Sequence, residues 1–206
     1  MKKVKNVNLL TQNSKIKKTS KHFNKKVFNF SIPAYKSETG KVTCPMADKC
    51  IKFCYAQKGF YILSKIYSEA KLEATMKDNF IELMNKAIVD KKAEYIRVHD
   101  SGDYYSKKYL DKWLEIARSN PSVRFYSYTN NVTMIKKIKD LPINFDFIFS
   151  DSGKQSHLIN KKTDRHTKIF SSLESLKKAK YKNTSDYDLY ATKWYNDTKK
   201  VGLIYH

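Results

Sequence analysis

The middle of the chain alternates short apolar segments with amphipathic ones, and this alternation constrains the fold more than any other feature of the sequence. Three short segments are rich in β-branched and aromatic residues, as strands are: residues 95–99, 123–128 and 145–150. Residues 107–119 and about 132–139 lie between them and have helical periodicity. The order and spacing predict an α/β fold: a parallel sheet with right-handed βα crossovers, built as an open sheet or a partial (half) barrel.

The flanking regions extend this pattern in both directions. Residues 28–34 alternate Phe, Phe and Ile with smaller or polar residues, which predicts an earlier strand. Residues 60–91 have helical periodicity and predict two helices broken near 75–78. Beyond residue 151 the pattern predicts three further elements: a strand at 168–170, a helix at 172–180 and a strand at 201–205.

Polar residues come immediately after each of the three central predicted strands. Because the carboxyl ends of parallel strands gather at one edge of a sheet, where ligands bind, these residues are candidates for a site. A titratable histidine beside two carboxylates makes His99, Asp100 and Asp103 the candidates for catalysis. The candidates for binding a cofactor are Ser101, Gly102, Thr129, Asn130, Asp151 and Ser152. The alternative is that these residues cap helices and form tight turns, with a hydrogen-bonded structural histidine.

All the cysteines of the chain, Cys44, Cys50 and Cys54, lie in one short segment. Cys50 and Cys54 are four residues apart, which predicts that they share one face of a helical turn, with Cys44 upstream in a loop. Three converging thiolates suit a 4Fe-4S iron-sulfur cluster with one open iron, or a zinc ion whose fourth ligand is His or water. Buried free cysteines are the alternative. The odd number of cysteines and the lack of a signal peptide argue against a disulfide.

The chain carries a formal net charge of +21, and its first 37 residues contain ten lysines and no acid. Such an excess attracts polyanions, so nucleic acid is the expected partner of the lysine-rich N-terminal segment, with solvated lysines as the alternative. No stretch reaches the about 20 apolar residues of a membrane span, so we expect a cytoplasmic protein with no membrane contact. We divide the chain into a basic, flexible N-terminal arm at 1–27 and a single α/β domain at 28–206, with a cysteine loop at 43–58.

Short sequence blocks around the cysteines and the strand ends form a recognisable pattern. The blocks are Phe28-Asn29-Phe30-Ser31-Ile32-Pro33-Ala34, Thr43-Cys44-Pro45, Cys54-Tyr55-Ala56, Gly59-Phe60-Tyr61, His99-Asp100-Ser101-Gly102-Asp103-Tyr104-Tyr105-Ser106, Phe125-Tyr126-Ser127-Tyr128-Thr129 and Val201-Gly202-Leu203-Ile204-Tyr205-His206. Together they resemble the gene product 88 family of phage and plasmid proteins over most of the chain from residue 28 onward. The resemblance implies an origin in a phage or another mobile element, and a cluster bound by cysteines. Relatives carry a second cysteine cluster where this chain has residues 191–197 without cysteine, so no role is expected here for a second metal site.

A cysteine loop after an early strand, followed by a parallel sheet with polar strand ends, is also similar to radical S-adenosylmethionine enzymes. In such an enzyme Asp100 and Asp103 would hold the amine or ribose of S-adenosylmethionine. Those enzymes separate their cysteines by three and then two residues, whereas five and then three separate them here. Three classes stay open: an iron-sulfur protein with or without radical chemistry, a non-catalytic nucleic-acid-binding accessory protein with a structural metal site, and a zinc protein with three Cys and one His ligand.

Overall fold

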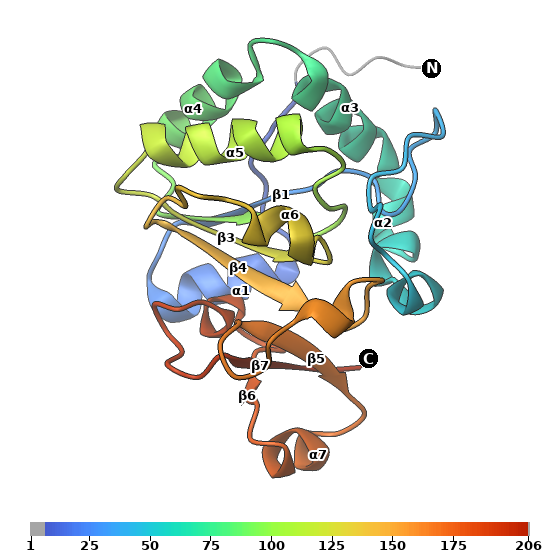
Figure 1. Ribbon diagram of the computed structural model, residues 1–206. Coiled ribbons are helices and arrows are strands. Elements are labelled where there is room, and N and C mark those ends of the chain that lie inside the picture. Colours follow the sequence, from blue (N-terminus) through green and yellow to red (C-terminus); the bar gives the residue numbers. More distant parts are fainter. Residues whose placement is uncertain (1–6, 206) are drawn as a thin grey trace.

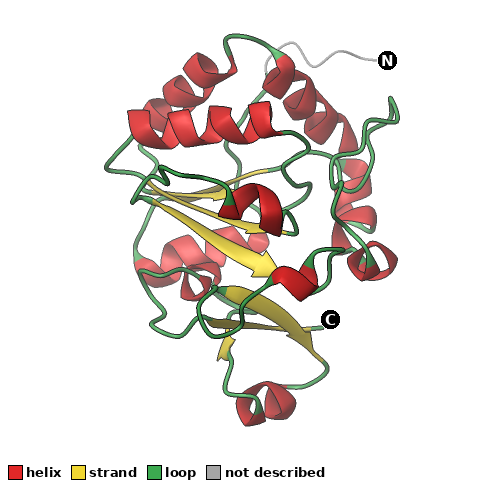
Figure 2. Cartoon of the chain, in the orientation of Figure 1, coloured by secondary structure: helices red, strands yellow, loops and turns green. Residues whose placement is uncertain are grey.

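A seven-stranded parallel sheet organises the computed structural model, which describes residues 7–205 (Figures 1 and 2). The strand order is β1-β2-β3-β4-β5-β7-β6, and every pairing is parallel. The sheet is open and curved as a half-barrel, so the predicted α/β fold class is confirmed. The strands are β1 (Val27–Phe30), β2 (Tyr95–Val98), β3 (Arg124–Thr129), β4 (Phe145–Ser150), β5 (His166–Phe170), β6 (Lys182–Asn183) and β7 (Lys200–Ile204).

Helices cover both faces of this sheet. In Figure 1, α3, α4 and α5 lie on one side of the central strands and α1 lies on the other. Within residues 7–205, no helix is both long and apolar enough to cross a membrane. The helices are α1 (Ser14–Phe23), α2 (Phe60–Leu63), α3 (Lys65–Met76), α4 (Phe80–Lys91), α5 (Lys107–Ser119), α6 (Val132–Lys136) and α7 (Leu173–Lys178), with short 3-10 helices η1 (Lys49–Phe53), η2 (Tyr55–Gln57), η3 (Ser156–Leu158) and η4 (Asp188–Ala191).

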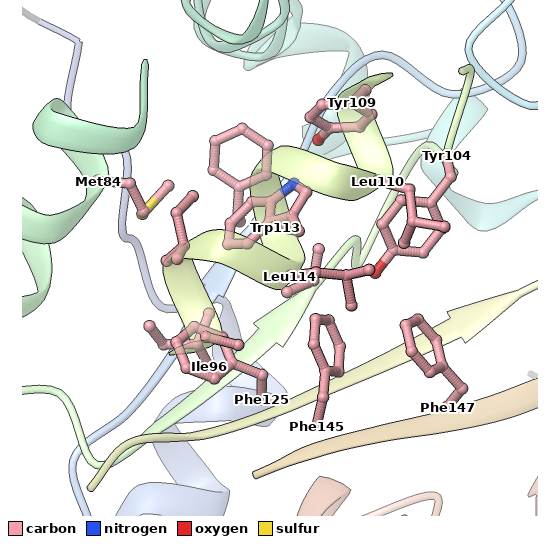
Figure 3. Close-up of a cluster of buried hydrophobic side chains, with 14 of the residues drawn as sticks. Met84, Ile96, Tyr104, Tyr109, Leu110, Trp113, Leu114, Phe125, Phe145 and Phe147 are labelled. Atoms are coloured by element: carbon pink, nitrogen blue, oxygen red, sulfur yellow. The ribbon is translucent and has the colours of Figure 1, made fainter. Parts of the chain in front are cut away.

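The larger core lies between the sheet and helix α5, which covers one face of it (Figure 3). Ile96 and Phe125 point from β2 and β3 toward this helix, and Trp113 fills the space above them; all three are fully buried. The Oγ of Ser106 caps α5 by accepting from the Tyr109 N–H (3.2 Å). The cap and the apolar stripe of α5 together explain why its bounds match the predicted range 107–119.

The observed strands differ from the expected ones most at β1, β5 and β6. β1 stops at Phe30 instead of continuing to residue 34, because the Ile32 N–H donates to the Ser101 carbonyl (3.2 Å) and Pro33 has no N–H. β5 begins at His166, two residues before the predicted start. β6 was not predicted, and its two residues are too few to produce a periodic signal. The expected break in the 60–91 helical region falls between α3 and α4.

The expected arm at 1–27 is not separate from the domain over the part that the structure describes, residues 7–27; residues 1–6 lie outside the described residues. Leu10 is buried, and α1 packs fully buried Ile16 against the sheet. The Nζ of Lys15 forms an ion pair with buried Asp188 (2.7 Å), and Asn13 caps the helix by accepting from the Ile16 N–H (2.8 Å). The apolar stripe of α1 is narrow and lies among many lysines, so composition concealed it.

Gly102, in the turn after β2, and Gly40, in an earlier loop, have nearly equal φ angles but different surroundings. Gly102 has φ +83°, and a Cβ there would overlap Cγ1 of Ile32; Gly40 has φ +82° and no atom within 4 Å of such a Cβ. We expect Gly40→Ala to cost about 1 kcal/mol from backbone strain alone. Gly102→Ala should cost about 1–3 kcal/mol more, measured by urea unfolding.

The overlap is checked by the double variant Gly102→Ala with Ile32→Ala. Removing the Ile32 side chain removes the obstacle, so the double variant should be more stable than the sum of the two single changes predicts. A cost at Gly102 equal to the cost at Gly40 would contradict this packing.

Candidate functional site

The cysteine loop lies across the carboxyl ends of the central strands, at the right of Figure 1. In the segment after β2, the Asp103 N–H donates to the Thr43 carbonyl (3.0 Å). After β4, the Lys154 N–H donates to the Met46 carbonyl (2.9 Å), and Gly153 forms an antiparallel bridge with Ala47. The first half of the loop is therefore fastened to two strand exits, at the sheet edge where the sequence predicted a site.

The carboxylate of Asp100 is the centre of the polar contacts at this edge. Its side chain is buried, and four side chains donate hydrogen bonds to its two oxygens. Oδ2 accepts from Asn13 Nδ2 (2.8 Å), Asn29 Nδ2 (2.9 Å) and Tyr61 OH (3.1 Å), and Oδ1 accepts from Ser31 Oγ. Asp100 thus joins the segment before α1, the end of β1 and helix α2, which follows the cysteine loop.

Two tyrosines attach the second half of the cysteine loop, and helix α2 after it, to Asp100. Tyr61 OH reaches the carboxylate, and Tyr55 OH donates to the Asp100 main-chain carbonyl. The two rings meet edge to face, with centroids 5.4 Å apart. Tyr55 is nevertheless 54% exposed, so this half of the loop is attached by its hydroxyl groups and not by deep burial.

Asp103 fixes the geometry of the next strand exit. Its Oδ1 accepts from Thr129 Oγ1 (2.7 Å) and from the Tyr104 N–H (2.7 Å), and its Oδ2 accepts from the Asn130 N–H (2.9 Å). Burial raises the pKa of this carboxyl group, and those hydrogen bonds lower it by a smaller amount. Asp103 therefore links the exits of β2 and β3, and Gly102 supplies the left-handed turn before it.

The remaining candidates for binding a cofactor either bond to other groups of the protein or lie away from Asp100 and Asp103. Ser101 Oγ donates to the Ile32 carbonyl (2.7 Å) and is buried. Asp151 forms an ion pair with Lys161 (2.9 Å). Ser152 is half-buried after β4. The structure thus brings Asp100, Asp103, Thr129 and Asn130 to the edge under the cysteine loop, mostly as residues that shape it.

His99 lies in the aromatic core and not at an open edge. Its φ of +65° turns the ring under α5, where its Nε2 is 2.8 Å from Tyr109 OH. Phe30, Tyr104 and Trp113 surround the ring, which is 2% exposed. Burial lowers the pKa of His99 to about 3, so the ring is neutral at neutral pH. His99 therefore does not lie at the open sheet edge where the sequence placed a candidate for catalysis, and desolvation favours an uncharged ring in the core.

The cysteines lie in one loop but do not share a helical face. η1 is a 3-10 helix with three residues per turn, so residues four apart point in different directions, and Cys54 follows η1 in an extended conformation. The expected alignment of Cys50 and Cys54 on one helical turn is therefore wrong. Among residues 7–205, no group of three or more His, Cys, Asp or Glu side chains converges closely enough to hold a metal ion.

Two of the thiols have raised pKa values, and the sulfur atom of Cys44 accepts a backbone hydrogen bond. The Tyr35 N–H donates to Cys44 Sγ (3.3 Å). Burial raises the pKa of Cys44 to about 12, and the Asp103 carboxylate adds to this shift. Burial also raises the pKa of Cys54, and the nearby Ala56 and Gln57 N–H groups oppose that shift. Cys54 is close enough to both other thiols for their charges to interact.

A second polar cluster, which was not predicted from the sequence, lies on the α1 face of the sheet. The carboxylate of Asp188 is fully buried and accepts from Arg97 Nη1 (3.1 Å), Lys15 Nζ (2.7 Å) and Tyr126 OH (2.9 Å). Burial opposes the charge, but Arg97 and Lys15 lower the pKa of Asp188 to about 2. The only local signal was a charged Arg97 inside an apolar strand, since its partner is far along the chain.

The fold and this edge define an α/β protein in which a cysteine loop closes the carboxyl end of a parallel sheet. The chain belongs to the gene product 88 family, whose pattern matches residues 5–203. It is similar to the gene 88 protein of Mycobacterium phage L5, with 28% identity over 102 residues. That match covers 42% of this chain and 42% of the phage L5 protein. No solved structure matches the chain.

Removing the charge of Asp100 should loosen the cysteine loop. In Asp100→Asn the amide nitrogen cannot accept, so at least one buried donor loses its partner, at a cost of about 2–4 kcal/mol. Hydrogen exchange at residues 55–63 should rise more than exchange in α5. Asp111→Asn, which changes an exposed carboxylate paired with Lys107, is the matched control and should change neither quantity. Unaltered exchange at 55–63 in Asp100→Asn would contradict the role of Asp100.

The buried neutral His99 should make stability fall with acid. The folded-state pKa is about 3, and the unfolded value is about 6.5, so the unfolded chain binds one more proton between these values. The free energy of unfolding should therefore drop by about 1.4 kcal/mol per pH unit as the pH falls below about 6. His99→Asn keeps a residue that tolerates positive φ and should lose this part of the slope. The comparison is urea unfolding from pH 6.5 to 4.5, with exposed His157→Asn as the control; parallel profiles for wild type and His99→Asn would refute it.

Proposed function

We propose that this protein binds a 4Fe-4S iron-sulfur cluster through Cys44, Cys50 and Cys54, with one iron open to a further ligand. The observation that carries the proposal is that Cys54 is close enough to both other thiols for their charges to interact, while the Tyr35 N–H donates to Cys44 Sγ (3.3 Å). Such a donor stabilises a thiolate, which is the form that binds iron or zinc. The donor set also fits, because three thiols and no carboxylate ligand favour a soft metal site.

Coordination would require the loop to close around the metal. Cys50 must turn toward Cys54 and Cys44, since the three do not converge in the structure. η1 is a short 3-10 helix with weak hydrogen-bond geometry, so its rearrangement costs little compared with the energy of metal–thiolate bonds. Because burial raises the pKa of Cys44 to about 12, metal binding would release protons, and affinity should increase with pH.

The proposal does not extend to radical chemistry on S-adenosylmethionine. Asp100 and Asp103 were the residues expected to hold that cofactor, and internal donors occupy both oxygens of each carboxylate. The proposed role is that of a cluster-binding protein of phage origin acting in the cytoplasm of the bacterial host. The zinc alternative, with three Cys and one His, has no histidine converging with the cysteines among the described residues.

Metal content separates these possibilities. Anaerobic purification should give a brown protein with absorbance near 400 nm and about four irons and four sulfides per chain. Each of Cys44→Ser, Cys50→Ser and Cys54→Ser should lower the iron content sharply. His99→Asn is the control, because a ring buried under α5 has no part in the cluster, and iron should stay bound.

Two results would overturn the cluster. About one zinc per chain, with no iron or sulfide, would establish the zinc protein instead, and loss of that zinc in His99→Asn would identify the fourth ligand. A colourless protein without metal after anaerobic iron and sulfide reconstitution would leave the cysteines as free buried thiols.

A further inference from the structure

A lysine-rich pocket lies away from the cysteine loop, where β5 and β7 begin. Its volume is about 720 Å³, and His166 and Lys200, paired in register, form part of its wall. Figure 1 shows the surrounding elements, β5, β6, β7 and α7, at the end of the molecule that contains the last third of the chain. The lysines that line it come from separate segments: Lys161, Lys162, Lys180, Lys199 and Lys200.

The positive charge of this pocket is largely unbalanced. Asp197 is the one acidic residue in its lining, and Lys161 is already paired with Asp151 (2.9 Å). In the described part of the chain, Lys162, Lys180 and Lys199 form no ion pair with a carboxylate. Lysines gathered on one concavity repel each other, and a bound polyanion removes that repulsion.

An aromatic ring is held rigidly among these lysines. Tyr181 lines the pocket, and its hydroxyl group is 2.9 Å from Nε2 of His166. His166 Nδ1 lies 2.9 Å from the Asp164 carbonyl, which can only accept, so Nδ1 carries the proton and Tyr181 OH donates to Nε2. The Phe170 ring packs edge to face against Tyr181, with centroids 5.0 Å apart. The tyrosine ring is therefore fixed in orientation before any ligand arrives.

We propose that this pocket binds single-stranded nucleic acid, with backbone phosphates on Lys162, Lys180 and Lys199 and a base against the Tyr181 ring. Proteins that bind single strands combine a positively charged groove with aromatic side chains on which bases stack. The pocket is larger than one phosphate group requires, and its lysines are spread over three segments, so it fits a ligand whose phosphates repeat. This site differs from the lysine-rich N-terminal segment that the sequence indicated.

The test compares two triple variants with the same change of charge. Fluorescence anisotropy of a labelled 20-nucleotide oligo-dT is measured from 50 to 300 mM salt, with wild type and with Lys162→Gln, Lys180→Gln and Lys199→Gln combined. Losing three phosphate contacts should weaken binding at least tenfold at low salt and reduce the salt slope by about 2. The control combines Lys17→Gln, Lys18→Gln and Lys21→Gln, three exposed positions on α1, and should keep most of the affinity.

Stacking is tested by two substitutions at one position. Tyr181→Phe keeps the ring and should bind like wild type, whereas Tyr181→Leu should lose several-fold in affinity. The proposal is overturned if the chain does not bind oligo-dT, if both triple variants lose affinity equally, or if Tyr181→Leu binds as well as Tyr181→Phe. Metal content is read separately from the same preparations, so failure here leaves the cluster proposal unaffected.

Discussion

The buried carboxylate of Asp100 is the contact on which the rest of this structure depends. Its donors come from before α1, from the end of β1 and from α2, so one residue holds three segments that are distant in sequence. A carboxylate can be buried only when its oxygens are hydrogen-bonded, because an unpaired buried charge costs several kcal/mol. The same requirement fixes Asn13, Asn29 and Tyr61 in place, and with them the path of the chain over the sheet edge.

Burial of the sheet on both faces explains where the other polar groups lie. Alternate residues of β2 enter opposite layers: Ile96 lies under α5, whereas Arg97 lies on the α1 face. A charge in that position needs a partner from the covering layer, and Asp188 of η4 supplies it, with Lys15 of α1 on the same carboxylate. α1 is therefore held by this ion-pair cluster as well as by Ile16, and its many exposed lysines do not make it an independent arm.

The sequence predicted those parts of the fold whose signals are local. β4 and α5 have the predicted bounds, because four of the six residues of the strand are large and apolar and the helix combines a cap with a wide apolar stripe. α1 was missed since its lysines outnumber its buried residues. In the candidate site, the position of the cysteine loop could be predicted from strand order. The buried position of His99 could not be predicted, because it depends on a left-handed φ whose energetic cost is offset only by packing against α5.

The cysteine loop differs from the rest of the molecule in what holds it. Among the described residues, no member of either apolar core falls between Ile32 and Leu72. Hydrogen bonds and short 3-10 turns fasten this stretch, and each such bond contributes only about 1 kcal/mol net. Packing excludes few of the other conformations that such a segment can adopt. A cross-link among its three thiols would therefore add stability that the core does not provide. All three cysteines lie in this stretch, which is the longest one in the described residues without a member of either core, and the proposed metal site would fasten it.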